Sequence, residues 1–303
     1  MAQKITSFKE LTAHLKNLDS KRRIALANAV DAHSLEAVIM AVEAEIAEAY
    51  LVGDAKVIKE MIGDKANLPA IHIIDVPEID AAIKEAVRMV KEGEADVLMK
   101  GLVNTDVILR AVLDKERGLL KPGSVLTYNA ALEIPGYHKL VFFSDPAVIP
   151  APNLEQRVAM IKYAIESARK FGIEKPKVAL IHATEKANPK VHFMQDYVTI
   201  MEMYRNGEFG TDVIIDGPID IFLALSKEHG EIKKVDTPVL GDADVIIFPS
   251  FEAANAFYKG LVIFANTEMG GILQGTDKPV VLTSRSDSTQ TKFYSIAVGC
   301  ALS

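Results

Sequence analysis

The stretch Lys278-Pro-Val-Val-Leu-Thr-Ser-Arg-Ser-Asp-Ser288 is the most informative part of the sequence. Its apolar run, Pro279 to Leu282, predicts a buried strand that ends directly in hydroxyl, guanidinium and carboxylate groups. Open α/β sheets bind ligands just outside the carboxyl ends of their strands. Arg beside Ser suits an anion such as phosphate, because guanidinium is charged, planar and bidentate. The alternative is a helix cap formed by Asp287 or Ser288. The polar residues concerned are Thr283, Ser284, Arg285, Ser286, Asp287 and Ser288.

Helical and strand patterns alternate along almost the whole sequence. Strands are expected at 23–27, 49–53, 70–74, 96–99, 140–143, 177–181, 212–215, 244–248 and 279–282. Helices are expected at 8–18, 34–46, 54–62, 78–92, 104–115, 153–171, 190–206, 218–228, 250–265 and 288–302. This alternation predicts an α/β fold with parallel or mixed sheets flanked by helices on both faces.

A proline-rich segment, Pro146-Ala-Val-Ile-Pro-Ala-Pro152, interrupts the alternation. Its three prolines remove backbone donors and fix φ, so we expect a hinge between two domains there. A chain of 303 residues supports two domains, because single cores usually stop growing at roughly 250–300 residues. The irregular stretch 117–137 predicts a hairpin or an extended crossover.

Composition and charge narrow the class of protein. The chain is 49% hydrophobic and 25% charged, which is typical of a globular protein. Its net charge of −7 argues against a nucleic-acid partner or an anionic membrane surface. No apolar run approaches the roughly 18 residues of a membrane span, and the N-terminus lacks a signal pattern. A single cysteine, Cys300, excludes a disulfide framework. We therefore expect a soluble cytoplasmic protein without membrane or nucleic-acid partners.

Several familiar motifs are missing from the sequence. There is no Gly-x-Gly-x-x-Gly fingerprint, and Gly270-Gly-Ile-Leu-Gln-Gly275 lacks the Lys-Ser/Thr of a P-loop. We expect that glycine-rich stretch to form a tight turn. The seven histidines have no metal-ligand spacing, so no metal site is expected. Cys300 stands among apolar residues and is expected to be a small core side chain.

A second polar segment, Lys100-Gly-Leu-Val-Asn-Thr-Asp-Val-Ile-Leu-Arg110, runs from a strand end into a helix. Lys100, Asn104 and Thr105 would lie at the N-terminus of that helix, where free N–H groups and the dipole favour an anion. A helix cap explains Asn104 equally well, but it does not explain Lys100. For Arg110 the alternative to ligand binding is a solvated surface charge.

A third segment, Phe248-Pro-Ser-Phe-Glu-Ala-Ala-Asn-Ala-Phe-Tyr-Lys-Gly-Leu261, predicts another helix after a strand. Glu252, Asn255 and Lys259 would lie about one turn apart on one face, and the small alanines between them allow close approach of a ligand. The alternative is an ordinary amphipathic helix.

These segments, in this order, resemble the phosphate acyltransferase family, which includes phosphate acetyltransferases and phosphate butyryltransferases. The matching stretches are KGLVNTDVILRAVL (100–113), LVFFSDPAVIPAPN (140–153), DGP (216–218), FPSFEAANAFYKGL (248–261) and PVVLTSRSDS (279–288). The resemblance implies reversible transfer of a short acyl group, butyryl above all, from coenzyme A to inorganic phosphate. Coenzyme A thioester would be a substrate, with no tightly bound cofactor, and the protein would be a homodimer or higher homo-oligomer.

The resemblance also implies a fold similar to isocitrate and isopropylmalate dehydrogenases, with two α/β domains and an interdomain cleft. The first domain would be discontinuous, covering 1–143 plus 273–303, and the second would cover 144–272. Length favours the butyryltransferase branch. One departure follows Asp216-Gly-Pro218, where butyryltransferases commonly have Leu-Asp-Asn-Ala and this chain has Ile219-Asp-Ile-Phe-Leu. It leaves the preferred acyl chain open.

Functional residues carry over one at a time. Ser284 and Arg285 match the family's catalytic pair, and Arg110 matches a phosphate-binding arginine once a one-residue gap is allowed. The family's carboxylate, which helps to deprotonate the coenzyme A thiol, falls on Thr291, so Asp287 is the substitute that we expect. The other residues expected to bind phosphate or coenzyme A are Lys100, Asn104, Thr105, Glu252, Asn255, Ser286 and Ser288.

Two other functions stay open from the residues alone. A metal- and NAD-dependent dehydrogenase of similar two-domain fold could use Asp212, Asp216 and Asp220 as ligands, but it gives the Ser-Arg segment no role. A non-catalytic protein that binds coenzyme A or acyl phosphate could keep the site without a carboxylate at position 291.

Overall fold

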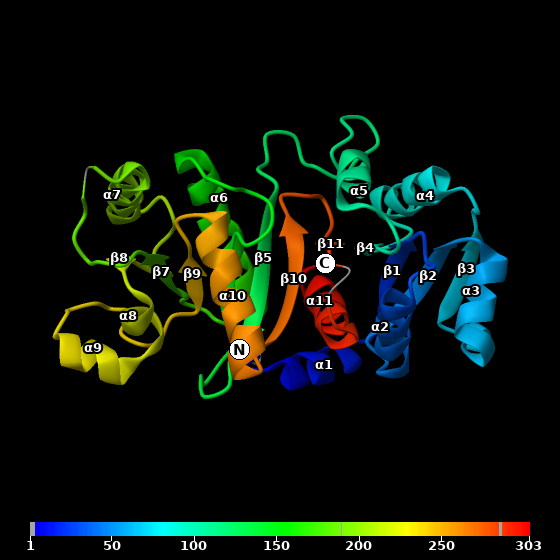
Figure 1. The fold of residues 1–303 in the computed structure, drawn as a ribbon, viewed down its shortest axis with the longest axis horizontal. Helices are drawn as coiled ribbons and strands as arrows, with labels where there is room; N and C mark the ends of the chain where they lie inside the picture. Colours follow the sequence, from blue (N-terminus) through cyan, green and yellow to red (C-terminus); the bar gives the residue numbers. More distant parts are fainter. Residues whose placement is uncertain (1–3, 189, 285–286) are drawn as a thin grey trace. The chain divides into compact units, whose positions relative to one another are not determined.

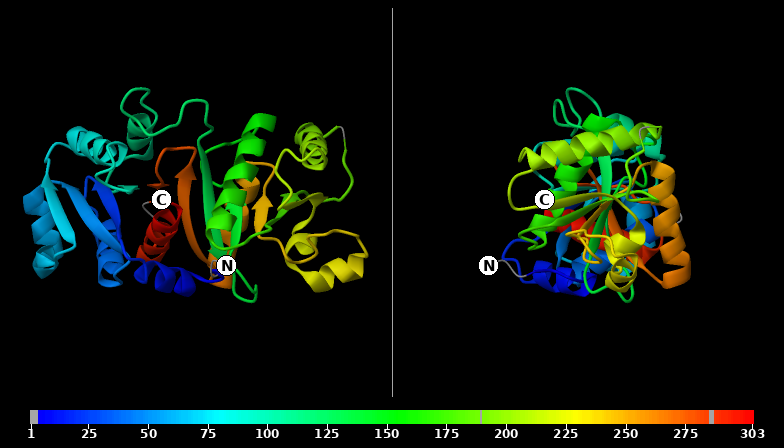
Figure 2. Two further views of the ribbon diagram at one scale, coloured as in Figure 1. Left: turned by 180° about the vertical axis from the view of Figure 1, so that it is seen from behind. Right: turned by 90° about the vertical axis from the view of Figure 1, so that its left-hand side faces the viewer.

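The computed structural model describes residues 4–188, 190–284 and 287–303, which fold as two units. The terminal unit consists of Phe8–Leu126 and Met269–Ser303, and the central unit consists of Met1–Ser7 and Thr127–Glu268. In Figure 1 the red C-terminal helix lies beside blue N-terminal helices, and Figure 2 shows the same arrangement from behind. The segment from Phe8 to Leu126 and the C-terminal segment from Met269 therefore build one unit.

The terminal unit is a sheet of βα repeats. In chain order its elements are α1 (Phe8–Lys16), β1 (Arg22–Ala27), α2 (Ala32–Glu43), β2 (Ala47–Gly53), α3 (Ala55–Ile62), a 3₁₀ helix (Gly63–Asn67), β3 (Ile71–Asp75), α4 (Ile79–Lys91), β4 (Val97–Lys100), α5 (Thr105–Val112), β10 (Glu268–Gln274), β11 (Val280–Val281) and α11 (Thr289–Leu302). The strands lie in the order β3-β2-β1-β4-β11-β10, and all neighbours are parallel except β10 and β11. The predicted α/β alternation is confirmed here.

Helices cover both faces of this sheet. Right-handed crossovers place α2 and α3 on one face, and α4, which returns the chain from β3 to β4, on the other. Helix α11 packs against α2 and α1, so it shares the first face. It is buried almost all round, from Lys292 to Cys300, as expected of a helix that is apolar on every side. Burial raises the pKa of the Cys300 thiol to about 12, in keeping with a core side chain.

The glycine-rich stretch 270–275 was expected to be a tight turn, and that prediction is wrong. Residues 268–274 form β10, which pairs with β11 through Leu273 and Val280. Glycine at position 270 has a packing reason: a Cβ there would lie 2.6 Å from the backbone of Tyr294 in α11. Gly270 thus allows the strand and the helix to approach closely, and only Gly275, with φ of +92°, makes the turn after it.

The central unit has a sheet in the order β5-β6-β9-β7-β8. Its elements are β5 (Thr127–Glu133), β6 (Val141–Ser144), α6 (Leu154–Lys170), β7 (Lys177–Ile181), α7 (His192–Arg205), β8 (Ile214–Ile219), α8 (Ile221–Leu225), α9 (Lys227–Lys233), β9 (Val245–Ile247) and α10 (Phe251–Ala265). Only β5 and β6 are antiparallel. The helix expected at 218–228 is two short helices, because Asp216-Gly-Pro218 belongs to β8 and Ser226 caps a new helix.

The unit boundaries fall at 126/127 and 268/269, whereas the sequence placed them at 143/144 and 272/273. The difference has a structural cause. Residues 127–144 form the antiparallel pair of β5 and β6, and β6 then pairs with β9. The pair therefore belongs to the central sheet, and the proline-rich segment lies inside the central unit, between β6 and α6.

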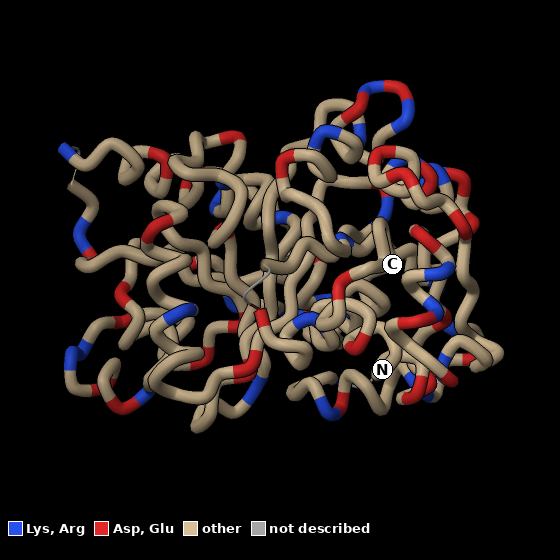
Figure 3. Tube along the Cα trace, turned by 45° about the vertical axis from the view of Figure 1, so that its right-hand side comes forward, with Lys and Arg blue, Asp and Glu red and all other residues tan. Residues whose placement is uncertain are grey.

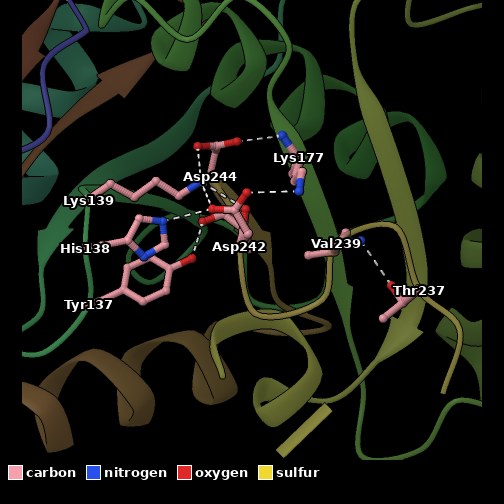
Figure 4. A network of polar contacts seen from close by, with 9 residues as sticks. Tyr137, His138, Lys139, Lys177, Thr237, Val239, Asp242 and Asp244 are labelled. Carbon is pink, nitrogen blue, oxygen red and sulfur yellow. Dashed lines mark hydrogen bonds and ion pairs between the residues drawn. The ribbon is translucent and has the colours of Figure 1, made fainter. Parts of the chain in front are cut away.

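A buried ion-pair network stabilises the central unit at the N-terminal ends of β6, β7 and β9 (Figure 4). Lys139 donates to the carboxylate of Asp244 at 2.6 Å and forms an ion pair with Asp242 at 2.7 Å. Asp242 also pairs with Lys177 at 2.9 Å, and Asp244 accepts the backbone N–H of Lys177. The network joins the starts of three strands.

Charged residues of both signs are interspersed along the trace (Figure 3). The net charge is −7. A site for an anion must therefore draw its positive charge from local side chains. In the part of the chain that the structure describes, no helix is long and apolar enough to cross a membrane.

Candidate active site

The carboxyl ends of β1, β4 and β11 lie side by side in the terminal unit. Register pairs Ala27 with Lys100 and Val281 with Met99. Gly101 allows the chain to leave β4 here, since a Cβ would lie 2.4 Å from the carbonyl oxygen of Asn28. Two of the polar segments that the sequence singled out, 100–110 and 283–288, therefore start from neighbouring strands.

The turn after β11 is fixed through the backbone of Ser284. The carboxylate of Asp287 accepts the N–H of Ser284 at 2.7 Å, and the N–H of Asp287 donates to the carbonyl of Ser284 at 3.3 Å. The Ser284 residue is exposed. Arg285 and Ser286, which the sequence also assigned to the site, lie outside the described residues. Asp287 thus shapes the turn that presents Ser284.

Helix α11 begins immediately after this turn. Ser288 is its N-cap and accepts the N–H of Thr291, so the capping interpretation of Ser288 is correct. The Thr291 hydroxyl lies 3.1 Å from that of Ser288. A threonine at position 291 therefore completes the cap, at the position where the resemblance would place a carboxylate.

Lys292 is a site residue that the sequence prediction missed. Its side chain comes from the first turn of α11 and is buried, at 2% exposure. The ammonium donates to the carbonyl of Ser284 at 2.8 Å and to the hydroxyl of Thr283 at 3.2 Å. Burial lowers the pKa of Lys292, and the charges of Asp31 and Asp287 oppose this shift. A basic residue inside an otherwise apolar helix was the signal available in the sequence.

Lys100, Asn104 and Thr105 lie at the start of α5, as predicted. Lys100 ends β4, is 4% exposed, and donates to the carbonyl of Val103 at 3.3 Å. Asn104 is the N-cap residue, but its side chain makes no capping hydrogen bond to the helix. Helix capping therefore explains Asn104 less well than the sequence suggested. The ammonium of Lys100 is a second buried positive charge at this edge of the sheet, in addition to that of Lys292.

Arg110 lies on an exposed face of α5. Its guanidinium forms an ion pair with Asp106, four residues earlier. It lines a groove of about 770 Å³ between α4 and α5, together with Arg88 and Arg117. The structure thus gives Arg110 a partner on its own helix, and a role in phosphate binding stays a prediction.

Glu252 and Asn255 belong to α10 of the central unit. Ser250 caps this helix, and Glu252 is exposed in its first turn. The Asn255 amide donates to the carbonyl of Pro146 at 2.9 Å. Asn255 therefore fastens α10 to the proline-rich segment, which is a structural role that the sequence did not indicate.

Two of the three aspartates considered as metal ligands, Asp216 and Asp220, have other partners. Asp216 accepts the hydroxyl of Thr237 at 2.5 Å. Asp220 caps α8 and pairs with Lys233 at 2.6 Å. Both carboxylates therefore have structural roles in the central unit.

Comparisons with known proteins identify the family. The model of the phosphate acetyl/butaryl transferase family matches residues 77–300. The chain belongs to this family. A phosphate butyryltransferase of Clostridium beijerinckii is 40% identical over 294 residues, which is 96% of each chain. A phosphate acetyltransferase of Thermotoga maritima is 37% identical over 281 residues, covering 91% of this chain and 94% of that protein.

A solved structure agrees with this assignment. The branched-chain phosphotransacylase of Enterococcus faecalis V583 superposes with a TM-score of 0.81 at 30% identity, covering 93% of this chain and 98% of that one. The family resemblance inferred from the five stretches is confirmed. The α/β fold with a mixed sheet flanked by helices is likewise that of a phosphotransacylase.

Proposed function

We propose that this chain transfers an acyl group between coenzyme A and inorganic phosphate, so that acyl-CoA and phosphate give acyl phosphate and free coenzyme A. The match of 40% identity to a phosphate butyryltransferase, over 96% of both chains, carries the proposal. The strand end at Thr283–Ser284 supports it, because the buried ammonium of Lys292 donates hydrogen bonds to both residues there and Ser284 is exposed. As a member of this family the protein is an acyltransferase, and the dehydrogenase alternative is not favoured.

The chemistry requires stabilisation of negative charge. A phosphate oxygen attacks the thioester carbonyl carbon, the carbonyl oxygen becomes an oxyanion, and the carbon–sulfur bond then breaks with its electron pair on sulfur. The thiolate of coenzyme A leaves and takes a proton. Ser284 would hydrogen-bond the oxyanion or the sulfur, and Arg285 would neutralise phosphate. Losing one such donor typically costs about 3–4 kcal/mol of barrier.

Proton transfer and substrate binding are assigned by the same resemblance. Asp287 stays our candidate for the group that accepts the thiol proton in the reverse direction. Binding of phosphate and coenzyme A is assigned to residues around the two helix starts, to Arg110 and to α10. These are Lys100, Asn104, Thr105, Arg110, Glu252, Asn255, Ser286 and Ser288. If Arg110 binds phosphate, its ion pair with Asp106 must open.

Butyryl is the acyl group that we favour. This preference rests on sequence identity: the phosphate butyryltransferase of Clostridium beijerinckii is more similar to this chain than the phosphate acetyltransferase of Thermotoga maritima is. Two residues after Asp216-Gly-Pro218, Phe222 and Leu223, differ from the acid and amide that are common in butyryltransferases. Phe222 is 53% exposed and stacks on His229, whereas Leu223 is buried. Neither supplies the acid or amide that butyryltransferases have there.

A homodimer or higher homo-oligomer in the cytoplasm completes the proposal. The end of α10 exposes three consecutive apolar side chains, Val262, Ile263 and Phe264, at 43%, 69% and 88%. Exposed apolar groups of this kind mark interaction surfaces. Light scattering should give a molar mass of at least twice 33.0 kDa; a monomer at micromolar concentration would contradict this.

One assay tests the reaction. Release of free thiol is followed from butyryl-CoA, acetyl-CoA and a branched acyl-CoA, with and without inorganic phosphate and without added metal or NAD. Release that requires phosphate, fastest with butyryl-CoA, is the expected result. Binding of coenzyme A without phosphate-dependent release would instead favour the non-catalytic alternative.

A further inference from the structure

The ammonium of Lys292 is buried, and in the described part of the chain its hydrogen-bond acceptors are neutral oxygens. It donates to the carbonyl of Ser284 and to the hydroxyl of Thr283, at 2.8 and 3.2 Å. Among the described residues no carboxylate forms an ion pair with it, although the charges of Asp31 and Asp287 act on it from farther away. Its positive charge is therefore held inside the protein without direct neutralisation.

Such an arrangement is costly for the folded protein. A buried charge is normally paired, and an unpaired one is strongly disfavoured because it has lost its hydration. Burial accordingly lowers the pKa of Lys292. A neutral side chain of similar length, such as methionine, would avoid this cost in the interior of α11. Charged groups with shifted pKa values in such surroundings are typical of functional sites.

The two hydrogen bonds of Lys292 connect this charge to one residue. The carbonyl oxygen of Ser284 accepts a hydrogen bond from the Lys292 ammonium. The backbone N–H of Ser284 donates a hydrogen bond to the carboxylate of Asp287. The backbone of Ser284 is thus held at both of its polar groups. Thr283, the second acceptor, is buried at the end of β11 and immediately precedes Ser284. Moving the ammonium would release the turn that presents the Ser284 hydroxyl.

We propose that Lys292 is a positioning residue for acyl transfer, which holds Ser284 in place and places a fixed positive charge behind it. The inference rests on the proposed function, in which Ser284 acts on the reacting atoms. An ammonium fixed beforehand stabilises negative charge that develops at Ser284 without reorganisation during the reaction. This effect is greater in the transition state than in the substrate complex, so it should appear in kcat and leave KM nearly unchanged.

The experiment compares two buried lysines in the full-length protein. Lys292→Met removes the proposed charge, and Lys139→Met removes the buried ammonium of the central unit, to which the proposed reaction assigns no role. Both proteins are assayed with butyryl-CoA and phosphate at a temperature where circular dichroism shows them folded. We expect Lys292→Met to lower kcat about 10- to 100-fold, since small misplacements of catalytic groups cost about this much. KM for both substrates should change less than about threefold, and Lys139→Met should keep the wild-type kcat.

Two further variants make the test independent of the stability of Lys292→Met. Thr283→Val removes one acceptor of the Lys292 ammonium and keeps the side-chain shape, and we expect it to lower kcat about three- to tenfold. Lys292→Arg keeps the charge and should retain more of kcat than Lys292→Met. Three outcomes would overturn the inference: kcat of folded Lys292→Met within twofold of wild type, a rise in KM for phosphate with unchanged kcat, or unchanged kcat in Thr283→Val. The wild-type rate tests the reaction itself, so the two proposals fail separately.

Discussion

Both units bury lysine side chains, and Lys139 of the central unit differs from Lys292 of the terminal unit in how its charge is neutralised. Lys139 of the central unit contacts the carboxylates of Asp242 and Asp244 at 2.7 and 2.6 Å. Among the residues that the structure describes, the ammonium of Lys292 in the terminal unit forms hydrogen bonds with a hydroxyl and a carbonyl and no ion pair with a carboxylate. The first lies at the N-terminal ends of its strands and the second at the C-terminal end of β11, where α/β folds bind ligands. Burial alone therefore does not mark a functional lysine, whereas burial without a counter-charge does.

The largest effect that we expect is the loss of turnover in Arg285→Ala. The resemblance assigns Arg285 to phosphate, so its loss removes a charged donor that is needed most in the transition state. Turnover should fall about 100- to 1,000-fold. Steady-state kinetics with butyryl-CoA and phosphate measure the loss, and a thermal melt checks the fold. Arg205→Ala, at an exposed position in the last turn of α7, is the matched control and should keep its rate. Near-normal turnover of Arg285→Ala would remove the basis for placing the reaction at the C-terminal end of β11.

The opposite result is expected for Lys139, which lies at the N-terminal ends of strands β6, β7 and β9 in the central unit. Lys139→Met should lower the free energy of unfolding and leave the rate of turnover unchanged. Removing one partner of a buried ion pair leaves the other charge uncompensated, which costs about 3–5 kcal/mol. Here Asp244 would remain, at 3% exposure, without its ammonium partner. Urea unfolding should show the loss in the free energy of unfolding. The Lys139→Met and Asp244→Asn double variant is the control and should recover part of the stability. A loss below 1 kcal/mol would mean that water neutralises these carboxylates.

The pH dependence of turnover should report the charge on Lys292. The pKa of Lys292 lies below its ordinary value of 10.5, because burial outweighs the charges of Asp31 and Asp287. As pH rises through this lowered pKa, the ammonium loses its proton, so kcat should decline before pH 10.5. Lys292→Arg should keep its charge to higher pH and shift the decline upward. The reaction should be measured in the direction from acyl-CoA and phosphate, because free coenzyme A, whose thiol would itself titrate, is then a product and not a substrate. An identical alkaline limb in both proteins would assign the decline to another group.

Sequence patterns predicted much of the fold but less of the site. The apolar strand at 279–282 and the helix from 288 were expected, because period and composition are local properties. Strand β10 was missed because glycine is generally unfavourable in strands. Gly270 is explained by the close approach of α11, a tertiary contact that the local pattern does not contain. The prediction was therefore most reliable where local propensity and packing agree.

The site shows the same limit. Ser284 and Lys100 could be placed from the sequence, because strand ends meet at one edge of a parallel sheet. The exposure of Arg110 was one of the two interpretations that the sequence left open, whereas the hydrogen bond from Asn255 to the carbonyl of Pro146 depends on packing that no spacing shows. Lys292 left a usable signal: a single basic residue in a helix that is apolar all round, next to a polar turn. A charge on such a helix cannot reach solvent easily and must have a partner or a function.

The smallest effect expected is on stability at acid pH, and it concerns the partner of Lys139. Burial alone would raise the pKa of Asp242, but hydrogen bonds from Lys139 and Lys177 outweigh it and hold the pKa well below 3.8. A carboxylate with a depressed folded pKa stabilises the protein above its unfolded pKa, and this contribution is lost as pH falls through the folded value. Asp242 is half-exposed, so solvent screens part of the interaction.

Asp242→Asn should therefore reduce the unfolding free energy modestly at pH 7, and the difference from wild type should shrink as pH falls below 3.8. Urea unfolding between pH 3 and 7 measures it. Asp236→Asn, a nearby aspartate for which no ion pair links it to this network in the described part of the chain, serves as the control and should run parallel to wild type. A constant difference at all pH values would mean that Asp242 acts through packing and not through its charge. In that case the central lysine would owe its neutralisation to Asp244 alone, and the contrast with Lys292 would rest on one buried carboxylate.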